Sequence, residues 1–120
     1  MSIFIKPGIK VFVYGETIDM RAGFGRLSAL VAEKMKGNLF EGHLFLFLGK
    51  NPRRAKLLKF DGTGLILSTK RLDQGTFMRV TEFYETREIA QEDLERLLDG
   101  ANLSVVFQAR ERVRNGKDVA

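Results

Sequence analysis

The sequence contains no cysteine and no tryptophan, and only one histidine and two prolines occur among its 120 residues. Without cysteine, the chain can build no disulfide framework, no thiolate zinc site and no cysteine nucleophile. Its longest uncharged apolar run covers residues 44–49, far short of the ~20 residues that a membrane span needs. The first seven residues lack the apolar region of a signal peptide. We therefore expect a cytoplasmic protein that makes no membrane contact and carries neither a metal nor another cofactor.

The length fits one domain, because domains typically contain ~100–200 residues. Hydrophobic residues make up 44% and charged residues 29% of the chain, which is the balance of a globular protein. We expect a single α+β domain over residues 1–107. Residues 108–120 contain few large apolar side chains and are predicted to form a flexible tail or a frayed helix.

Hydrophobic periodicity predicts the elements of this domain. Apolar residues spaced by three and four predict a helix over residues 20–36, with Thr17 or Asp19 as its N-terminal cap and Gly37 as its C-terminal cap. Apolar and β-branched runs bounded by turn residues predict strands, and a second short helix is predicted at 91–99. The predicted strands cover residues 9–14, 43–48, 55–60, 65–71, 76–84 and 103–107.

The expected fold is therefore α+β: an antiparallel β-meander sheet of about five to six strands, with one main helix packed on it and a short C-terminal helix. The strand at 43–48 is apolar on both alternating faces, so we expect it to be central and covered on both sides. Turns are expected at 49–54, 61–64 and 73–75, where glycine, proline, asparagine and aspartate cluster.

The formal net charge of +5 is unevenly distributed along the chain. Residues 49–79 contain eight bases and two acids, whereas residues 82–99 contain seven acids and two bases. The basic segment is typical of a surface for a polyanion, and the acidic segment could meet a different partner. The alternative is that both are ordinary solvated faces.

Few residues could carry catalysis. His43 is the only histidine and begins the most apolar predicted strand, where a lone histidine is usually structural. No serine is placed with it by a catalytic motif. Asp19, Asp61 and Asp73 stand at predicted element boundaries, where aspartate usually caps a helix or forms a turn. A two-metal nuclease built from these aspartates is the rarer alternative, so we expect no enzyme activity.

Residues 21–25 break two local rules of the predicted helix. Gly23 and Gly25 each disfavour a helix by up to ~1 kcal/mol relative to alanine, and Arg21 would stand in the first turn, where the helix dipole disfavours a base. Such conflicts often mark a functional site. The structural alternative is a tight contact between helix and sheet, with Arg21 paired to Asp19 or Asp61. The sequence leaves both interpretations open.

The predicted hairpin around residues 49–60 is the best candidate for nucleic-acid binding, because a basic β-hairpin can follow a phosphate backbone. Phe60 and Phe77 lie near these bases in the sequence and could stack on nucleobases, although core positions are more usual for phenylalanine in strands. The predicted nucleic-acid-binding residues are Lys50, Arg53, Arg54, Lys56, Lys59, Lys70 and Arg71.

Four motifs occur in a recognisable order along the chain. They are Asp19-Met20-Arg21-x-Gly23-Phe24-x-x-Leu27, Gly42-His43-Leu44-Phe45-x-Phe47, Arg54-x-Lys56-x-Leu58-x-x-Asp61-Gly62-x-Gly64 and Lys70-Arg71-Leu72-x-x-Gly75-x-Phe77. Together they resemble the small accessory protein encoded by the second open reading frame of the insertion sequence 66 group. One departure is Phe60, which stands where many members have tryptophan or tyrosine before the Asp-Gly pair.

This resemblance implies a non-catalytic accessory protein of insertion-sequence transposition, working beside a larger transposase that carries the catalytic acidic residues. It implies the transposase as a partner, with DNA and further copies of the chain as candidate partners. Two alternatives remain open: an adaptor that docks the transposase through the acidic segment 82–99 without DNA contact, and a metal-dependent nuclease using Asp19 and Asp61 with Arg21 on the phosphate.

Overall fold

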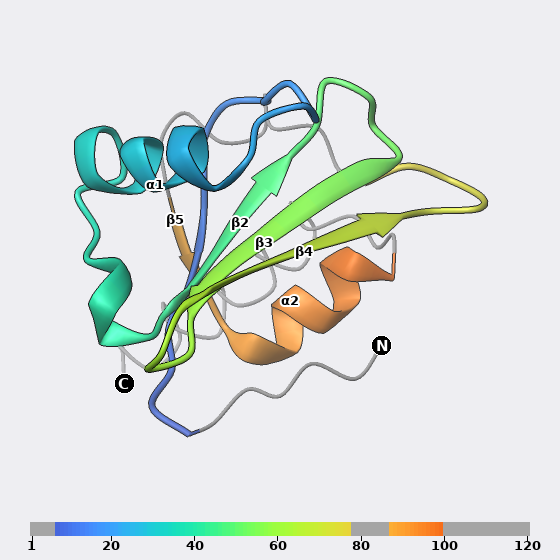
Figure 1. Ribbon diagram of the computed structural model, residues 1–120. Helices are drawn as coiled ribbons and strands as arrows, with labels where there is room; N and C mark the ends of the chain where they lie inside the picture. Colours follow the sequence, from blue (N-terminus) through green and yellow to red (C-terminus); the bar gives the residue numbers. More distant parts are fainter. Residues whose placement is uncertain (1–6, 78–86, 100–120) are drawn as a thin grey trace, which may run out of the picture.

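The computed structural model describes residues 7–77 and 87–99, and Figure 1 shows how their elements are arranged. The predicted strand 103–107, the tail 108–120 and residues 78–84 of the predicted strand 76–84 lie outside the described residues. In chain order, the elements are β1 (Val11–Val13), α1 (Phe24–Glu33), the short 3₁₀ helix η1 (Leu39–Glu41), β2 (Leu44–Leu48), β3 (Arg54–Phe60), β4 (Leu65–Arg71), β5 (Arg87–Ile89) and α2 (Gln91–Leu98).

Within residues 7–77 and 87–99, five strands form one sheet in the order β4-β3-β2-β1-β5, which confirms the α+β class. One of them, β5, was not among the predicted strands. β2 is central and all of its residues are buried, as its doubly apolar pattern predicted. Neighbouring strands are antiparallel, except that β1 and β2 run parallel with Val11 opposite Leu44. This one parallel pair departs from a pure meander, and α1 provides the crossover connection that two parallel strands need.

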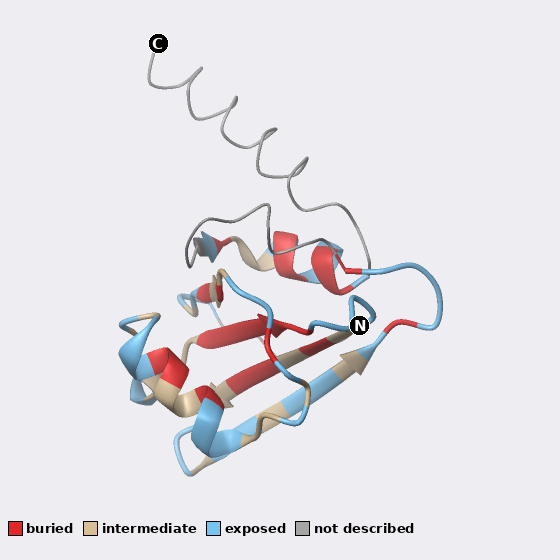
Figure 2. Ribbon diagram, turned by 90° about the horizontal axis from the view of Figure 1, so that it is seen from above, coloured by how far each residue is buried: buried red, intermediate tan, exposed pale blue. Residues whose placement is uncertain are grey.

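The two helices cover opposite faces of the sheet (Figures 1 and 2). Because successive β2 side chains point to opposite faces, Phe45 and Phe47 pack under α1, whereas Leu44, Leu46 and Leu48 pack under α2. Both sheet faces therefore carry a core, and the exposed positions lie on the turns, the loops, the outer faces of the helices and the edge strand β4. No helix within residues 7–77 and 87–99 is long and apolar enough to cross a membrane.

The N-terminal end of α1 lies later in the chain than predicted, and neither Thr17 nor Asp19 caps it. The N-cap is Gly23, which offers no side-chain hydrogen bond. Asp19 instead closes a turn before the helix: its carbonyl accepts the Ala22 N–H at 3.0 Å, and its carboxylate accepts the Arg21 N–H at 2.9 Å. This local hydrogen bonding competes with helix formation over residues 19–22.

The C-terminal end of α1 also differs from the prediction. The helix ends at Glu33, and the left-handed backbone conformation falls on Lys36, with φ 55°, rather than on Gly37. Gly37 is instead needed for packing, because a Cβ there would lie 2.8 Å from the ring of Phe45.

Candidate nucleic-acid interface and adjacent pocket

The β2–β3 turn, residues 49–53, exposes Lys50 and Arg53 on a loop held by several hydrogen bonds. The Asn51 side-chain oxygen accepts the Arg53 N–H at 3.0 Å, and the Leu72 N–H, just after β4, donates to the Arg53 carbonyl at 2.8 Å. The Arg53 guanidinium donates to the Asp73 carbonyl at 3.1 Å. The turn is thus fixed to the end of β4, so its bases are presented from a defined position.

Arg54, at the start of β3, lies directly opposite Arg71, at the end of β4. Opposite residues of antiparallel strands have Cβ atoms ~4.5–5.5 Å apart on one face, so two positive charges are placed side by side. Neither arginine forms an ion pair with any residue in the described part of the chain, and the Nε of Arg54 is buried without a hydrogen-bond partner there. Opposed like charges destabilise a strand pair, so an anion bound from outside would reduce the repulsion between Arg54 and Arg71.

The seven bases predicted to bind nucleic acid do not share one face of the sheet. Arg54, Lys56 and Arg71 lie on the α1 face, whereas Lys59 and Lys70 lie on the α2 face. Lys59 also lies near the β3–β4 turn, at the opposite end of the hairpin from Lys50. We use the name "basic end" for the four bases at the β2–β3 turn and the adjoining strand ends: Lys50, Arg53, Arg54 and Arg71.

The side chain of Lys56 makes a hydrogen bond within the protein. Its ammonium donates to the carbonyl of Ala22 at 2.7 Å, which joins β3 to the segment that precedes α1. No local pattern predicted this contact, because the two residues are far apart in the chain.

Arg21 and Asp19 form a bidentate ion pair in which Arg21 Nη2 and Asp19 Oδ2 are 2.8 Å apart. The guanidinium hydrogen bonds and the Arg21 N–H hold the pKa of the Asp19 carboxyl well below its usual range. Both side chains are exposed, with 91% of Arg21 and 49% of Asp19 accessible. Of the two carboxylates considered as partners of Arg21, Asp19 is the one that pairs with it, and Asp61 takes no part.

The glycines of this motif do not serve a tight contact between helix and sheet. A Cβ added at Gly23 or Gly25 would meet no atom within 4 Å, so that interpretation is wrong. Met20 packs against the core under α1, while Phe24, which the helix pattern placed on the apolar face, is 48% exposed.

Asp61 shapes the β3–β4 turn. Its Oδ1 accepts the N–H groups of Thr63 and Gly64 and the Thr63 hydroxyl, each at 2.9 Å, and Gly62 supplies a φ of 104°. The hydrogen bonds from Thr63 and Gly64 lower the pKa of the Asp61 carboxyl. The predicted turn-forming role is confirmed.

Asp19 and Asp61 lie at opposite ends of β3, because Ile18 bridges to Gly49 beside the β2–β3 turn. Seven strand residues extend ~20 Å, so the two carboxylates cannot share a metal ion. Among the residues that the structure describes, no group of three or more histidine, aspartate or glutamate side chains could hold a metal.

Neither aromatic candidate presents an exposed ring at the basic end. The Phe77 N–H donates to the Pro52 carbonyl of the β2–β3 turn at 2.6 Å, but the Phe77 ring points into the core. Phe77 is 2% exposed in the core under α2, which places it out of reach of a nucleobase. Phe60 meets Phe40 edge-on, with ring centroids 5.0 Å apart, and Phe40 is 77% exposed although the sequence did not single it out. His43 Nδ1 accepts the Lys10 N–H at 3.0 Å, in keeping with its predicted structural role.

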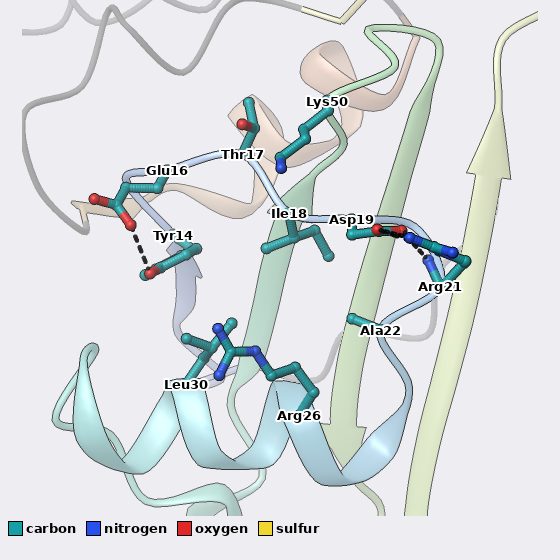
Figure 3. Close-up of a pocket in the computed structure, with 10 residues that line it drawn as sticks. All are labelled: Tyr14, Glu16, Thr17, Ile18, Asp19, Arg21, Ala22, Arg26, Leu30 and Lys50. Atoms are coloured by element: carbon teal, nitrogen blue, oxygen red, sulfur yellow. Dashed lines mark hydrogen bonds and ion pairs between the residues drawn. The ribbon is translucent and has the colours of Figure 1, made fainter.

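A pocket of about 480 Å³ opens between α1 and the loop that leaves β1 (Figure 3). Arg26 extends toward it from α1, and Lys50 extends toward it from the β2–β3 turn. At one end, the Tyr14 hydroxyl donates to Glu16 at 3.0 Å; burial and this bond raise the pKa of Tyr14. Sequence reasoning singled out neither Arg26 nor Glu16.

Comparison with known proteins identifies the family. A family model described as "IS66 Orf2 like protein" matches residues 9–108. The chain belongs to this family. The resemblance carried by the four motifs is thereby confirmed.

Two curated relatives come from Sinorhizobium fredii strain NBRC 101917 / NGR234. The uncharacterized protein y4hO is 40% identical over 70 residues, and the uncharacterized protein y4jC is 35% identical over 71 residues. The matched regions cover 58% and 59% of this chain, and the chain spans 61% of the length of each relative. No solved structure matches the chain significantly.

Proposed function

We propose that this protein is a non-catalytic accessory factor of insertion-sequence transposition that binds DNA through the basic end. Family membership supports the link to transposition. The observation that carries DNA binding is the opposed pair Arg54 and Arg71, which has no carboxylate partner among the described residues. Guanidinium groups pair with phosphate in a bidentate manner, so a DNA backbone is a fitting counter-charge.

Salt dependence tests this proposal quantitatively. Contact of the four bases of the basic end with phosphates would give a slope of about −3 to −4 for log K against log salt. The assay is fluorescence anisotropy with DNA that carries the terminal repeats of the element. A flat salt dependence, or no binding at low salt, would refute DNA binding.

A double variant separates the basic end from overall charge. Arg54→Gln with Arg71→Gln should reduce the magnitude of the slope by about two and weaken binding to all sequences alike, because phosphate contacts carry no sequence information. The matched control is Lys34→Gln with Lys36→Gln, which removes the same amount of positive charge just after the C-terminal end of α1. Equal loss of binding in both double variants would argue against a localised site.

A second surface favours a role in binding the transposase. α2 lies on the sheet face opposite α1 (Figure 2). It buries Leu94, Leu97 and Leu98 against the sheet, and its Glu92 and Glu95 are exposed. An acidic helix there could dock a basic partner surface while the basic end holds DNA. Charge reversal of Glu92 and Glu95 should weaken co-purification with the transposase; undiminished recovery would exclude this surface.

A further inference from the structure

The pocket in Figure 3 is framed by an excursion of the chain from the sheet. The Tyr14 N–H donates to the Leu46 carbonyl, and the Ile18 N–H donates to the Leu48 carbonyl, both at 2.9 Å. Between these two anchors, residues 15–17 leave the sheet and form one rim of the pocket. The opposite wall of the pocket comes from α1. Backbone hydrogen bonds therefore hold both walls in place, those of the two anchors on one side and those of the helix on the other.

The pocket is lined by three bases and two carboxylates, so its lining carries a small excess of positive charge. Both carboxylates are engaged at the periphery, Glu16 with the Tyr14 hydroxyl and Asp19 with Arg21. Arg26 and Lys50 form no ion pair within the described chain, and they approach the hollow from opposite sides. An anionic group between these two side chains would neutralise both.

The remaining lining suits a flat, less polar group. Ile18, Ala22 and Leu30 form an apolar wall beside the two cations. The volume of about 480 Å³ falls within the range of ~300–1,000 Å³ that is typical of pockets for small molecules, a class that includes nucleotides. A nucleotide combines the two required properties, since it carries a phosphate and a planar base.

The pocket is also continuous with the basic end. Lys50 belongs to both, and the Asp19–Arg21 pair lies beside the pocket over β3, toward β4 (Figure 3). We propose that one unpaired nucleotide of the bound DNA enters this pocket, with its phosphate between Arg26 and Lys50 and its base against Ile18, Ala22 and Leu30. This inference rests on the proposed DNA binding.

An unpaired nucleotide is favoured over a nucleotide within a duplex, because the base of a stacked base pair cannot reach an apolar wall inside a pocket.

The test compares two fluorescent probes, a short blunt duplex and the same duplex with an unpaired thymidine tail. The protein should bind the tailed probe at least about fivefold more tightly at one fixed salt concentration, since contact with one base contributes ~1–3 kcal/mol. Arg26→Gln and Thr17→Glu should abolish this preference and leave affinity for the blunt duplex within about twofold. Lys34→Gln, an equal charge change elsewhere on α1, should retain it. All three positions are exposed, so the variants should fold.

The outcomes separate this inference from the proposed function. Equal binding of both probes by the unmodified protein, or equal weakening of both probes by Arg26→Gln and Thr17→Glu, overturns the pocket and leaves DNA binding intact. Binding of neither probe overturns both. Thymidine monophosphate should compete with the tailed probe; competition by inorganic phosphate at the same concentration would reduce the pocket to a simple anion site and overturn the nucleotide assignment.

Discussion

Lys56→Met distinguishes a structural lysine from a phosphate-binding one. The substitution removes the partly buried hydrogen bond of 2.7 Å that the Lys56 ammonium donates to the Ala22 carbonyl. Methionine keeps most of the aliphatic part of the lysine side chain. A hydrogen bond from a charged group contributes ~1.5–3 kcal/mol, and water can reach a partly buried carbonyl, so we expect a loss of about 1–2 kcal/mol in the free energy of unfolding. For a domain of this size, that loss lowers the melting temperature by roughly 4–10 °C.

Urea unfolding followed by circular dichroism measures the change, and the slope of the transition should stay constant if the loss is purely one of stability. Lys50→Met is the matched control, because Lys50 is exposed and makes no comparable bond. The control should leave stability nearly unchanged and reduce the magnitude of the salt slope of DNA binding by about one, whereas Lys56→Met should leave that slope intact. An unchanged urea midpoint for Lys56→Met, together with a reduced salt slope, would refute the structural role.

Three further predictions concern the turns and the start of α1. The pKa values of Asp19 and Asp61 lie below the ordinary 3.8 in the folded state, so their stabilisation is present above ~pH 4 and is lost as the pH falls through the folded-state values. The double variant Asp19→Asn with Asp61→Asn should therefore flatten the fall of the urea midpoint in acid, and an unaltered acid profile would contradict this. Gly62→Ala should lower the free energy of unfolding by about 1–2 kcal/mol, because φ is 104° there; a urea midpoint equal to that of the unmodified protein would contradict it. Gly25→Ala should raise the free energy of unfolding by up to about 1 kcal/mol, since an added Cβ meets no neighbour within 4 Å; a lower midpoint would indicate a contact that the structure does not contain.

The sequence predicted the β2–β3–β4 hairpins and α2 to within about one residue. In these segments the alternating or helical apolar pattern and the turn residues agree, as at Asp61 and Gly62. The start of α1 was wrong, because Met20 fits the helical spacing while the Asp19 turn and the Ile18–Gly49 bridge hold residues 18–22 in another conformation. The parallel β1–β2 pair and the short strand β5 depend on long-range pairing that no local pattern specifies.

The candidate site was predictable only in part. The bases of the β2–β3 turn were found from charge and turn composition, but their division between the sheet faces depends on the register of β3 with β4. The opposition of Arg54 and Arg71 follows from that register, and the bond from Lys56 to Ala22 follows from tertiary packing. The pocket depends on where the chain leaves β1, so nothing in the sequence marked Arg26 as part of it.

The pairing partners of β1 set an expected order of folding. β2, β3 and β4 pair with their neighbours in the chain, whereas Val11 pairs with Leu44 on one side and with Ile89 on the other. Closing these longer loops costs more chain entropy, so we expect the hairpins to form first and β1 to join afterwards. Pulsed hydrogen exchange would detect this as late protection of Val11 and Val13, and early protection there would contradict it. On this view the basic end forms early, and the nucleotide pocket, whose rim is the continuation of β1, is completed last.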